Sequence, residues 1–338
     1  MSTTHRIQLA GLSLLALTAA LAFAVAPPTE PPYRVSSPVR HENLTVFFLL
    51  GEDQIKGKTI LTLDEALKAK KVVVHETKNV NELAIENVSD AEVFVQAGDI
   101  VKGGQQDRTI ALDALVPPRS GRLPVSSFCV EQGRWSKRGG EDASRFSDSA
   151  RCIVGNDLKI AARREKSQGG VWKEVAVAQD KLAMATRSDV KDSRSQSSLQ
   201  LTLENKKVHE AIAAYVKALE DSLPCAKAGN VVGYAVAING KVMSADVYAN
   251  GDLFRRLWPK LLRASVTEAV SERKERVKVE EVKEAAVTAF LADAASGKRT
   301  ERKALRDQKE AQLETTKNVL FETTAPAGAV LRRSYLAK

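Results

Sequence analysis

Two short stretches, GDIVKGGQQDR (residues 98–108) and FCVEQGRW (residues 128–135), decide how this chain is interpreted. Each combines glycine, charged residues and glutamine, and a mainly apolar interval typical of paired strands separates them. We therefore expect two loops at strand ends that meet over one spot. The sequence indicates a candidate site there and leaves open which reaction, if any, takes place in it.

Strand-type runs surround these stretches at short intervals, which favours an antiparallel sheet over a βαβ array. The runs cover residues 43–50, 59–62, 71–76, 82–88, 92–96, 108–116 and 123–130. A short helix begins at Leu63, where Thr62 or Asp64 can cap it. The sequence thus predicts an N-terminal, antiparallel, β-rich domain over residues 43–155.

Residues 156–338 are predicted to form a helical region packed on this domain, so the expected fold class is α+β. Apolar residues indicate helices over 171–185, 208–219, the segment after Asp252, and 279–291. The polar segment 136–150 is predicted to be a loop or flap, and 189–198 is predicted to be a connector. The polar segment 297–307 is predicted to be exposed. Strand character returns at 318–323 and 330–336, a pair that would extend the second sheet or close the first.

The clearest local prediction is a β-hairpin. Asn239-Gly240 separates the β-type runs 231–238 and 241–248, and both turn residues must tolerate a positive φ angle. Asp252 is then expected to cap a helix whose solvated basic face carries Arg255, Arg256, Lys260 and Arg263.

The first 26 residues have the pattern of an export signal. Arg6 precedes a long uncharged apolar run, and small residues near Ala24 fit a cleavage site. Pro27 directly follows Ala26 and would hinder cleavage there, so an uncleaved N-terminal anchor stays open. Residues 27–42 are predicted to be a proline-rich linker. The expected location is periplasmic or extracellular.

The chain of 338 residues has a formal net charge of +9, which favours anionic partners. Only 5% of the residues are aromatic and no run of five like charges occurs, so no specific nucleic-acid partner is expected. Membrane contact is expected only through an uncleaved N-terminus.

Three cysteines, Cys129, Cys152 and Cys225, leave at least one thiol free in an exported protein. A Cys129–Cys152 disulfide and buried free thiols both fit this pattern. The four histidines and three cysteines show no zinc-ligand spacing, so we expect no metal site and no cofactor.

The first cluster offers an anion site. Gly103 and Gly104 allow close approach of a ligand to the backbone, and Lys102, Gln106 and Arg108 can bind phosphate or carboxylate. The spacing excludes both a P-loop and a dinucleotide-binding fingerprint. The alternative is a glycine turn in which Asp107 and Arg108 form an ion pair.

The second cluster follows a strand directly. Arg134 can bind a carboxylate or phosphate in a bidentate manner, Trp135 can stack on a planar group, and Gln132 can contribute hydrogen bonds. The alternative is a corner locked by Glu131 and an arginine, with Trp135 as its packing anchor.

Glu131 and Asp107 are the candidate acid or base residues. A thiol nucleophile at Cys129 would need His75 as its base, and this is the less favoured interpretation. The chain contains no GxSxG elbow for serine chemistry.

On these residues the chain resembles the ARG and rhodanese-phosphatase superfamily-associated protein domain family. The matching pieces include LTLDEA (61–66), AGDIVKGGQQDR (97–108), CVEQGRW (129–135) and Val171-Trp172. The resemblance implies an uncharacterised bacterial and archaeal domain associated with ADP-ribosylglycohydrolase and rhodanese-phosphatase proteins. It implies no established catalytic residue.

Three functions fit these observations. The first is an exported binding or accessory module for an anionic ligand, such as one that is nucleotide-like or related to ADP-ribose. The second is a hydrolase of phosphorylated or ADP-ribosylated substrates that uses Glu131 or Asp107. The third is a structural protein of the cell envelope that binds a protein partner.

Overall fold

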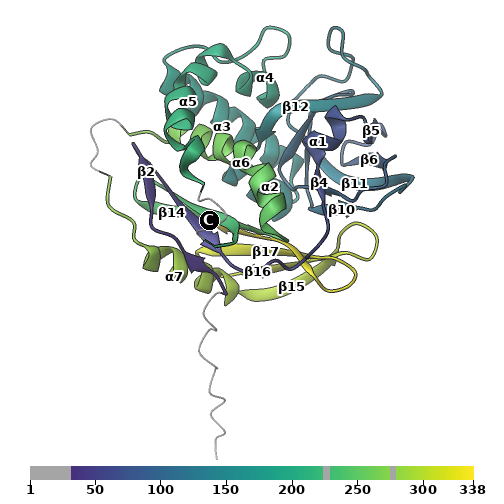
Figure 1. The fold of residues 1–338 in the computed structure, drawn as a ribbon. Coiled ribbons are helices and arrows are strands. Elements are labelled where there is room, and N and C mark those ends of the chain that lie inside the picture. The colour runs from purple at the N-terminus through teal and green to yellow at the C-terminus, as the bar shows by residue number, and fades with distance from the viewer. Residues whose placement is uncertain (1–31, 224–228, 275–278) are drawn as a thin grey trace, which may run out of the picture.

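The computed structural model describes residues 32–223, 229–274 and 279–338, which fold as an α+β structure with a β-rich N-terminal part, as predicted (Figure 1). The predicted signal or anchor, residues 1–26, lies outside the described residues. No helix in the described part of the chain is both long and apolar enough to cross a bilayer.

The strands are β1 (Arg34–Val35), β2 (Val39–His41), β3 (Leu44–Leu50), β4 (Leu61–Thr62), β5 (Val72–Glu76), β6 (Glu82–Asn87), β7 (Val93–Val95), β8 (Asp99–Gly103), β9 (Arg108–Ile110), β10 (Ala114–Val116), β11 (Arg122–Cys129), β12 (Arg145–Ile153), β13 (Val231–Ile238), β14 (Lys241–Tyr248), β15 (Lys298–Lys303), β16 (Lys309–Glu314), β17 (Asn318–Thr324) and β18 (Val330–Ala337). The helices are α1 (Leu63–Lys68), α2 (Asn156–Arg163), α3 (Gln168–Thr186), α4 (Leu199–Leu203), α5 (Lys206–Leu219), the 3₁₀ turn η1 (Glu220–Ser222), α6 (Gly251–Ser271) and α7 (Glu284–Ala295).

The strands form a large antiparallel sheet, a closed barrel and a small sheet. The large sheet has the order β1-β3-β13-β14-β18-β17-β16-β15, with β2 also paired to β3. The barrel has the order β11-β6-β5-β12-β8-β9, and the small sheet is β10-β7-β4. Because β1 and β2 pair with β3, part of the predicted linker belongs to the large sheet.

The centre of the large sheet is buried on both faces because helices cover both (Figure 1). Successive side chains of a strand point to opposite faces. In β3, Val46 and Phe48 therefore pack with α6, whereas Phe47 and Leu49 pack with α7. This explains why the LTVFFLL run of β3 is apolar without alternation.

The predicted hairpin is confirmed. Ile238 pairs with Lys241, and the turn residues Asn239 and Gly240 have φ angles of 50° and 81°. Positive φ at both positions is what a two-residue hairpin turn requires. The hairpin pairs with β3 on one side and β18 on the other, so it joins the N-terminal and C-terminal strands.

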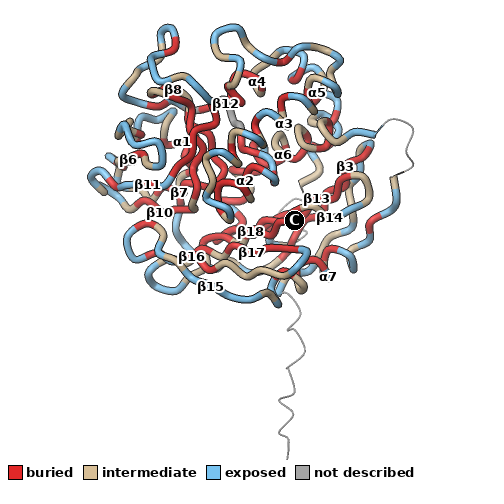
Figure 2. The backbone as a smooth tube through the Cα atoms, turned by 180° about the vertical axis from the view of Figure 1, so that it is seen from behind, coloured by how far each residue is buried: buried red, intermediate tan, exposed pale blue. Residues whose placement is uncertain are grey.

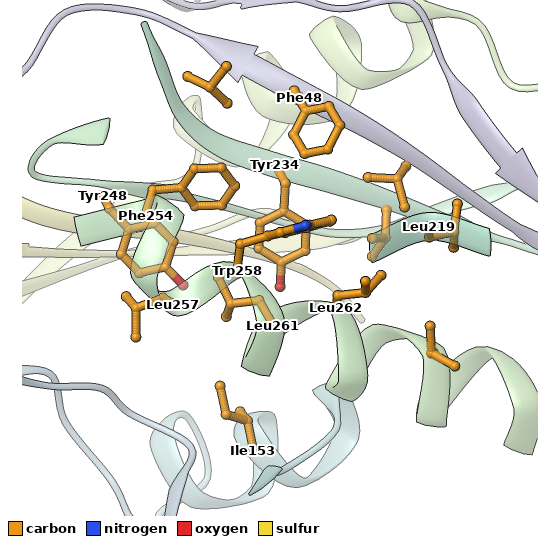
Figure 3. Packing of buried hydrophobic residues seen from close by; sticks show 14 of the residues in the cluster. Phe48, Ile153, Leu219, Tyr234, Tyr248, Phe254, Leu257, Trp258, Leu261 and Leu262 are labelled. Atoms are coloured by element: carbon orange, nitrogen blue, oxygen red, sulfur yellow. The ribbon is translucent and has the colours of Figure 1, made fainter. Parts of the chain in front are cut away.

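Helix α6 packs its aromatic face on the sheet, as Figure 3 shows. The Trp258 ring makes edge contacts with Phe48 and Tyr234 at centroid distances of 5.1 and 5.6 Å. Phe254 stacks on Tyr234 at 6.0 Å. Each large buried side chain of this kind stabilises the fold by about 2–3 kcal/mol.

Two predictions for α6 are wrong in detail. Asn250, not Asp252, caps the helix, because its side chain accepts a hydrogen bond from the Leu253 amide at 2.8 Å. Lys260 does not belong to a solvated face: it is buried, with Nζ 2.9 Å from Asp64 and 2.8 Å from Asp99. Helical periodicity did not reveal these two carboxylates because they come from distant segments.

Barrel closure depends on β12, most of which falls within the predicted loop 136–150. β12 pairs with β5 and β8, with Phe146 opposite Gly103. Its sequence, RFSDSARCI, lacks an apolar run, so its strand conformation comes from pairing on both sides. The predicted strand 108–116 is likewise two strands, β9 and β10, separated around Asp113.

The C-terminal strands β17 and β18 are confirmed, and they extend the large sheet beside β14. The segment 297–307, predicted to be polar and exposed, contains the edge strand β15 at residues 298–303. Its sequence KRTERK is charged and largely exposed. Charged side chains at a sheet edge oppose pairing with another chain, which explains the missing apolar signal.

Five buried charged side chains, named here the interior network, connect helix α2 and the β9–β10 loop to the large sheet. Arg332 contacts Asp113 at 2.8 Å and Asp246 at 2.7 Å. Arg163 contacts Asp113 at 2.7 Å and Glu310 at 2.6 Å. The strands that supply Arg332 and Asp246, β18 and β14, lie among the buried segments in Figure 2. Ionic contacts thus fix how the barrel side meets the sheet.

Candidate functional site

The two clusters do meet, where the β8–β9 turn touches the loop after β11. The Val130 amide donates to the Asp107 carbonyl at 2.9 Å, and the Asp107 amide donates to Glu131 Oε2 at 3.0 Å. Gln106 Nε2 also donates to the Glu131 carbonyl at 2.8 Å. The loops are therefore joined by hydrogen bonds that each use a backbone group of at least one loop.

The candidate acid or base residues lie at the centre of a cluster of charged side chains that we name the corner network: Asp107, Glu131, Arg134 and Arg138. Arg138 Nη1 lies 2.9 Å from Asp107 Oδ2 and 3.1 Å from Glu131 Oε1. Arg134 Nη2 lies 2.7 Å from Glu131 Oε2. Both carboxylates are fully buried, so each is bound within the protein and closed to solvent.

The environments of the two carboxylates shift their pKa values in opposite directions. Burial and the nearby charge of Glu131 raise the pKa of Asp107, against the hydrogen bond from Arg138. Burial also opposes ionisation of Glu131, but hydrogen bonds from Arg134, Ser195 and the Asp107 amide lower its pKa overall. Glu131 is the better stabilised anion of the pair.

Gly103 and Gly104 have a conformational role. Their φ angles are 125° and 55°, and a Cβ atom at Gly104 would lie 2.2 Å from Phe146 Cζ. Arg134 donates to both glycine carbonyls at 3.2 Å. The turn thus presents its carbonyls to the guanidinium group, a conformation that a side chain at Gly104 would block.

Arg108 lies beside the corner network, and its side chain is fully buried. Its Nη1 donates to the Val80 carbonyl at 2.6 Å and to Cys129 Sγ at 2.5 Å, while Nη2 lies 3.4 Å from Glu76 Oε1. Its Cζ atom lies 5.5 Å from the centroid of the Trp135 ring. That ring is 46% exposed, so the corner holds an indole at the surface with a buried cation beneath it.

Lys102 and Gln132 take no part in the contact between Arg108 and Trp135. Lys102 Nζ pairs with Glu204 Oε2 at 2.7 Å. Gln132 is exposed, and its carbonyl accepts a hydrogen bond from Ser197 Oγ at 2.6 Å. Of the predicted ligand-binding side chains, Lys102, Arg108 and Arg134 therefore already have protein carboxylates as partners.

Sequence reasoning missed Arg138, Ser198, Glu76 and Glu141. Ser198 Oγ donates to Asp107 Oδ2 at 2.8 Å, and Arg138 Nη2 lies 3.0 Å from Glu141 Oε1. Arg138 and Glu141 lie in the predicted polar loop, where their proximity to FCVEQGRW was the available signal. Ser198 ends the predicted connector, and no local pattern linked it to Asp107.

The Cys129 thiol is free and buried, so the proposed Cys129–Cys152 disulfide does not form. Burial raises the pKa of Cys129 to about 11, although Arg108 opposes the shift. His75 pairs with Glu86, with Nε2 2.9 Å from Oε2. Cys129 is therefore a poor nucleophile. The side chain of Cys152 and all of Cys225 lie outside the description.

Within the described residues, no group of three or more histidine, cysteine, aspartate or glutamate side chains is arranged to hold a metal ion. The corner itself brings together carboxylates, guanidinium groups and one exposed indole.

These features define an α+β protein in which a closed barrel adjoins a large antiparallel sheet and carries a braced loop corner. The chain belongs to the family of the ARG and Rhodanese-Phosphatase-superfamily-associated Protein domain, whose model matches residues 32–336. The resemblance seen in the sequence is thus confirmed, and the match runs from the residues before β1 into β18. No curated protein and no solved structure matches the chain.

Proposed function

We propose that this protein is an exported binding module and that the surface around Trp135 receives a planar, anionic ligand such as a nucleotide. The observation that carries the proposal is the Trp135 ring, 46% exposed and 5.5 Å from the Arg108 guanidinium carbon. An exposed indole offers a stacking face to a base at a cost in conformational entropy that is small for its contact area.

The corner network supports this function by holding the loop. Arg134 is bonded to Glu131 and to two glycine carbonyls immediately before Trp135 in the chain. A ring held in place before binding loses less conformational freedom on binding. The buried ion pairs thus act as a scaffold for Trp135.

The side chain that binds the negative charge of the ligand is not one of the three predicted cations. Arg108, Arg134 and Lys102 are occupied by Glu76, Glu131 and Glu204. Lys137, two residues after Trp135, is exposed and forms no ion pair with the described residues. We assign the anionic group of the ligand to Lys137.

Ligand binding to the full-length chain tests this proposal. AMP and ADP-ribose carry both a base and a phosphate, whereas adenosine and inorganic phosphate each supply one part. We expect the first two to bind best and Trp135→Ala to weaken them about tenfold or more, a loss of about 1.4 kcal/mol. Lys137→Ala should weaken AMP more than adenosine.

Met184→Ala is the matched control, because Met184 is 79% exposed on α3, outside the Trp135 surface. The proposal fails if none of the four compounds binds, or if Trp135→Ala binds AMP as tightly as the wild type. Absence of binding together with capture of a protein partner through Trp135 would favour the envelope-interaction alternative.

The hydrolase alternative has one specific observation in its favour. The pKa values of Asp107 and Glu131 move apart, as they do in acid–base pairs. Burial of both carboxylates argues against it, because substrate has no access to them in this conformation. Turnover of ADP-ribosylated peptide or a phosphoester that disappears in Glu131→Gln and Asp107→Asn would establish it over the binding module.

A further inference from the structure

A second site lies away from the corner, in a cavity of about 80 Å³ between α2, α3 and α6. Its apolar wall includes Leu158, Val177, Ala178 and Leu199. Polar groups line the rest: Asn156, Asp157, Glu174, Lys181, Glu268 and Glu272. A cavity with apolar walls and a few convergent polar groups is typical of a small-molecule site.

The charge of the polar part is negative although the whole chain is basic. Asp157, Glu174, Glu268 and Glu272 line the cavity, against the single cation Lys181 among its lining residues. Lys181 Nζ already contacts Glu272 Oε1 at 2.5 Å, so this pair is neutral. The remaining carboxylates attract a positive group, in contrast to the net charge of +9.

Glu268 is the carboxylate best placed to hold that group. It accepts a hydrogen bond from the backbone N–H of Asn156 at the start of α2, and it forms no ion pair with any described residue. Burial raises its pKa to about 7, with Asp157 and Glu272 adding to the shift and Lys159 opposing it. Lys159 therefore acts on Glu268 from a distance, without forming an ion pair with it.

Asn156 gives an independent indication of a ligand. The residue is 3% exposed and lines the cavity, yet its Nδ2 group has no hydrogen-bond partner among the described residues. Leaving a buried amide donor unpaired costs about 1–3 kcal/mol. A ligand oxygen that accepts from Nδ2 would remove that cost.

We infer that this cavity binds a small organic ammonium ion that has a short apolar body and a hydroxyl or carbonyl oxygen. The ammonium group pairs with Glu268, the oxygen accepts from Asn156 Nδ2, and the apolar body packs on Leu158 and Ala178. This site is independent of the proposed anion-binding surface, because the two share no residue and take ligands of opposite charge.

Isothermal titration of the full-length chain with 1-amino-2-butanol, with butyrate and 1-butanol as anionic and neutral probes, tests the inference. We expect the amino alcohol to bind and the other two compounds to bind at least about tenfold more weakly. Glu268→Gln should weaken the amino alcohol about tenfold or more, because the amide keeps the shape and loses the charge. Ala178→Leu should do the same by filling the cavity.

Glu210→Gln is the matched control, because Glu210 is an exposed glutamate of α5 outside the cavity. This variant should bind the amino alcohol with the same affinity as the wild type. Circular dichroism verifies that each variant is folded. The inference is overturned if the amino alcohol does not bind, if butyrate binds as well, or if either folded cavity variant binds with wild-type affinity.

Discussion

The corner network and the interior network are both buried sets of arginine and carboxylate, but they differ in how far apart their members lie in the sequence. The corner network comes from one stretch, Asp107 to Arg138, and closes two loops on each other. The interior network joins Asp113, Arg163, Asp246, Glu310 and Arg332. The ion pairs between near neighbours hold two loops in place, whereas the ion pairs between distant residues hold the barrel side against the large sheet.

The difference predicts different costs of breaking each network. Removing one partner of a buried ion pair leaves an uncompensated charge, which is more destabilising than the intact pair is stabilising. In the interior network the whole fold surrounds that charge. At the corner, a loop can open and expose it to water.

The largest expected effect is that of Arg332→Met. Its side chain is fully buried between Asp113 and Asp246, so the variant leaves both with one cation fewer. We expect a loss of about 3–5 kcal/mol in the free energy of unfolding, measured by urea denaturation. Arg299→Met, which breaks an exposed pair with Glu301, should cost less than about 1 kcal/mol.

Arg138→Met should have a smaller effect on global stability, about 1–3 kcal/mol, because Arg134 still pairs with Glu131 and the loop can open. Hydrogen exchange should accelerate at the Asp107 and Val130 amides and stay unchanged in β18. A global loss equal to that of Arg332→Met would contradict the distinction between the two networks.

The smallest expected effect is a pH dependence of opposite sign in the two networks. Arg163 and Arg332 overcome the cost of burial and lower the pKa of Asp113, so its contribution to stability is present above the ordinary pKa and is lost on acidification. The pKa of Asp107 is raised in the folded protein. Its contribution to stability is therefore present below the ordinary aspartate pKa and declines as the pH rises from that pKa to the raised one.

We expect stability to fall less steeply between pH 5 and pH 3 in Asp113→Asn than in the wild type, by about 1–2 kcal/mol. Urea denaturation across this pH range measures the difference. Carbon NMR titration of the carboxyl groups supplies the comparison, with Asp107 titrating above the ordinary aspartate value and Asp113 below it. Equal titration of both groups would mean that the two networks do not differ in this way.

The chain pattern predicted the elements whose signals are local. The Asn239-Gly240 turn, the apolar run of β3 and the helix at Leu63 required only neighbouring residues to be recognised. Of the two predicted capping residues, Thr62 and Asp64, it is Thr62 that caps the helix, through reciprocal hydrogen bonds with Glu65. The meeting of the two loops was also predictable, because both follow strand ends close together in the chain.

The elements that were missed obtain their conformation from partners. The polar strands β12 and β15 carry no apolar alternation, and pairing with neighbouring strands makes them extended. Lys260 occupies a helix position that periodicity assigned to solvent, and it is buried because Asp64 and Asp99 converge on it.

By itself, the sequence determined the α+β class, the family, the hairpin and the corner where residues 98–108 and 128–135 meet. Only the tertiary structure decided that the arginines of this corner face carboxylates inward and leave Trp135 at the surface. Only the tertiary structure joined Asp113 to Arg332. The physical reason is that periodicity and turn chemistry act between near neighbours, whereas the partner of a buried charge depends on which distant segments the fold brings within a few ångströms.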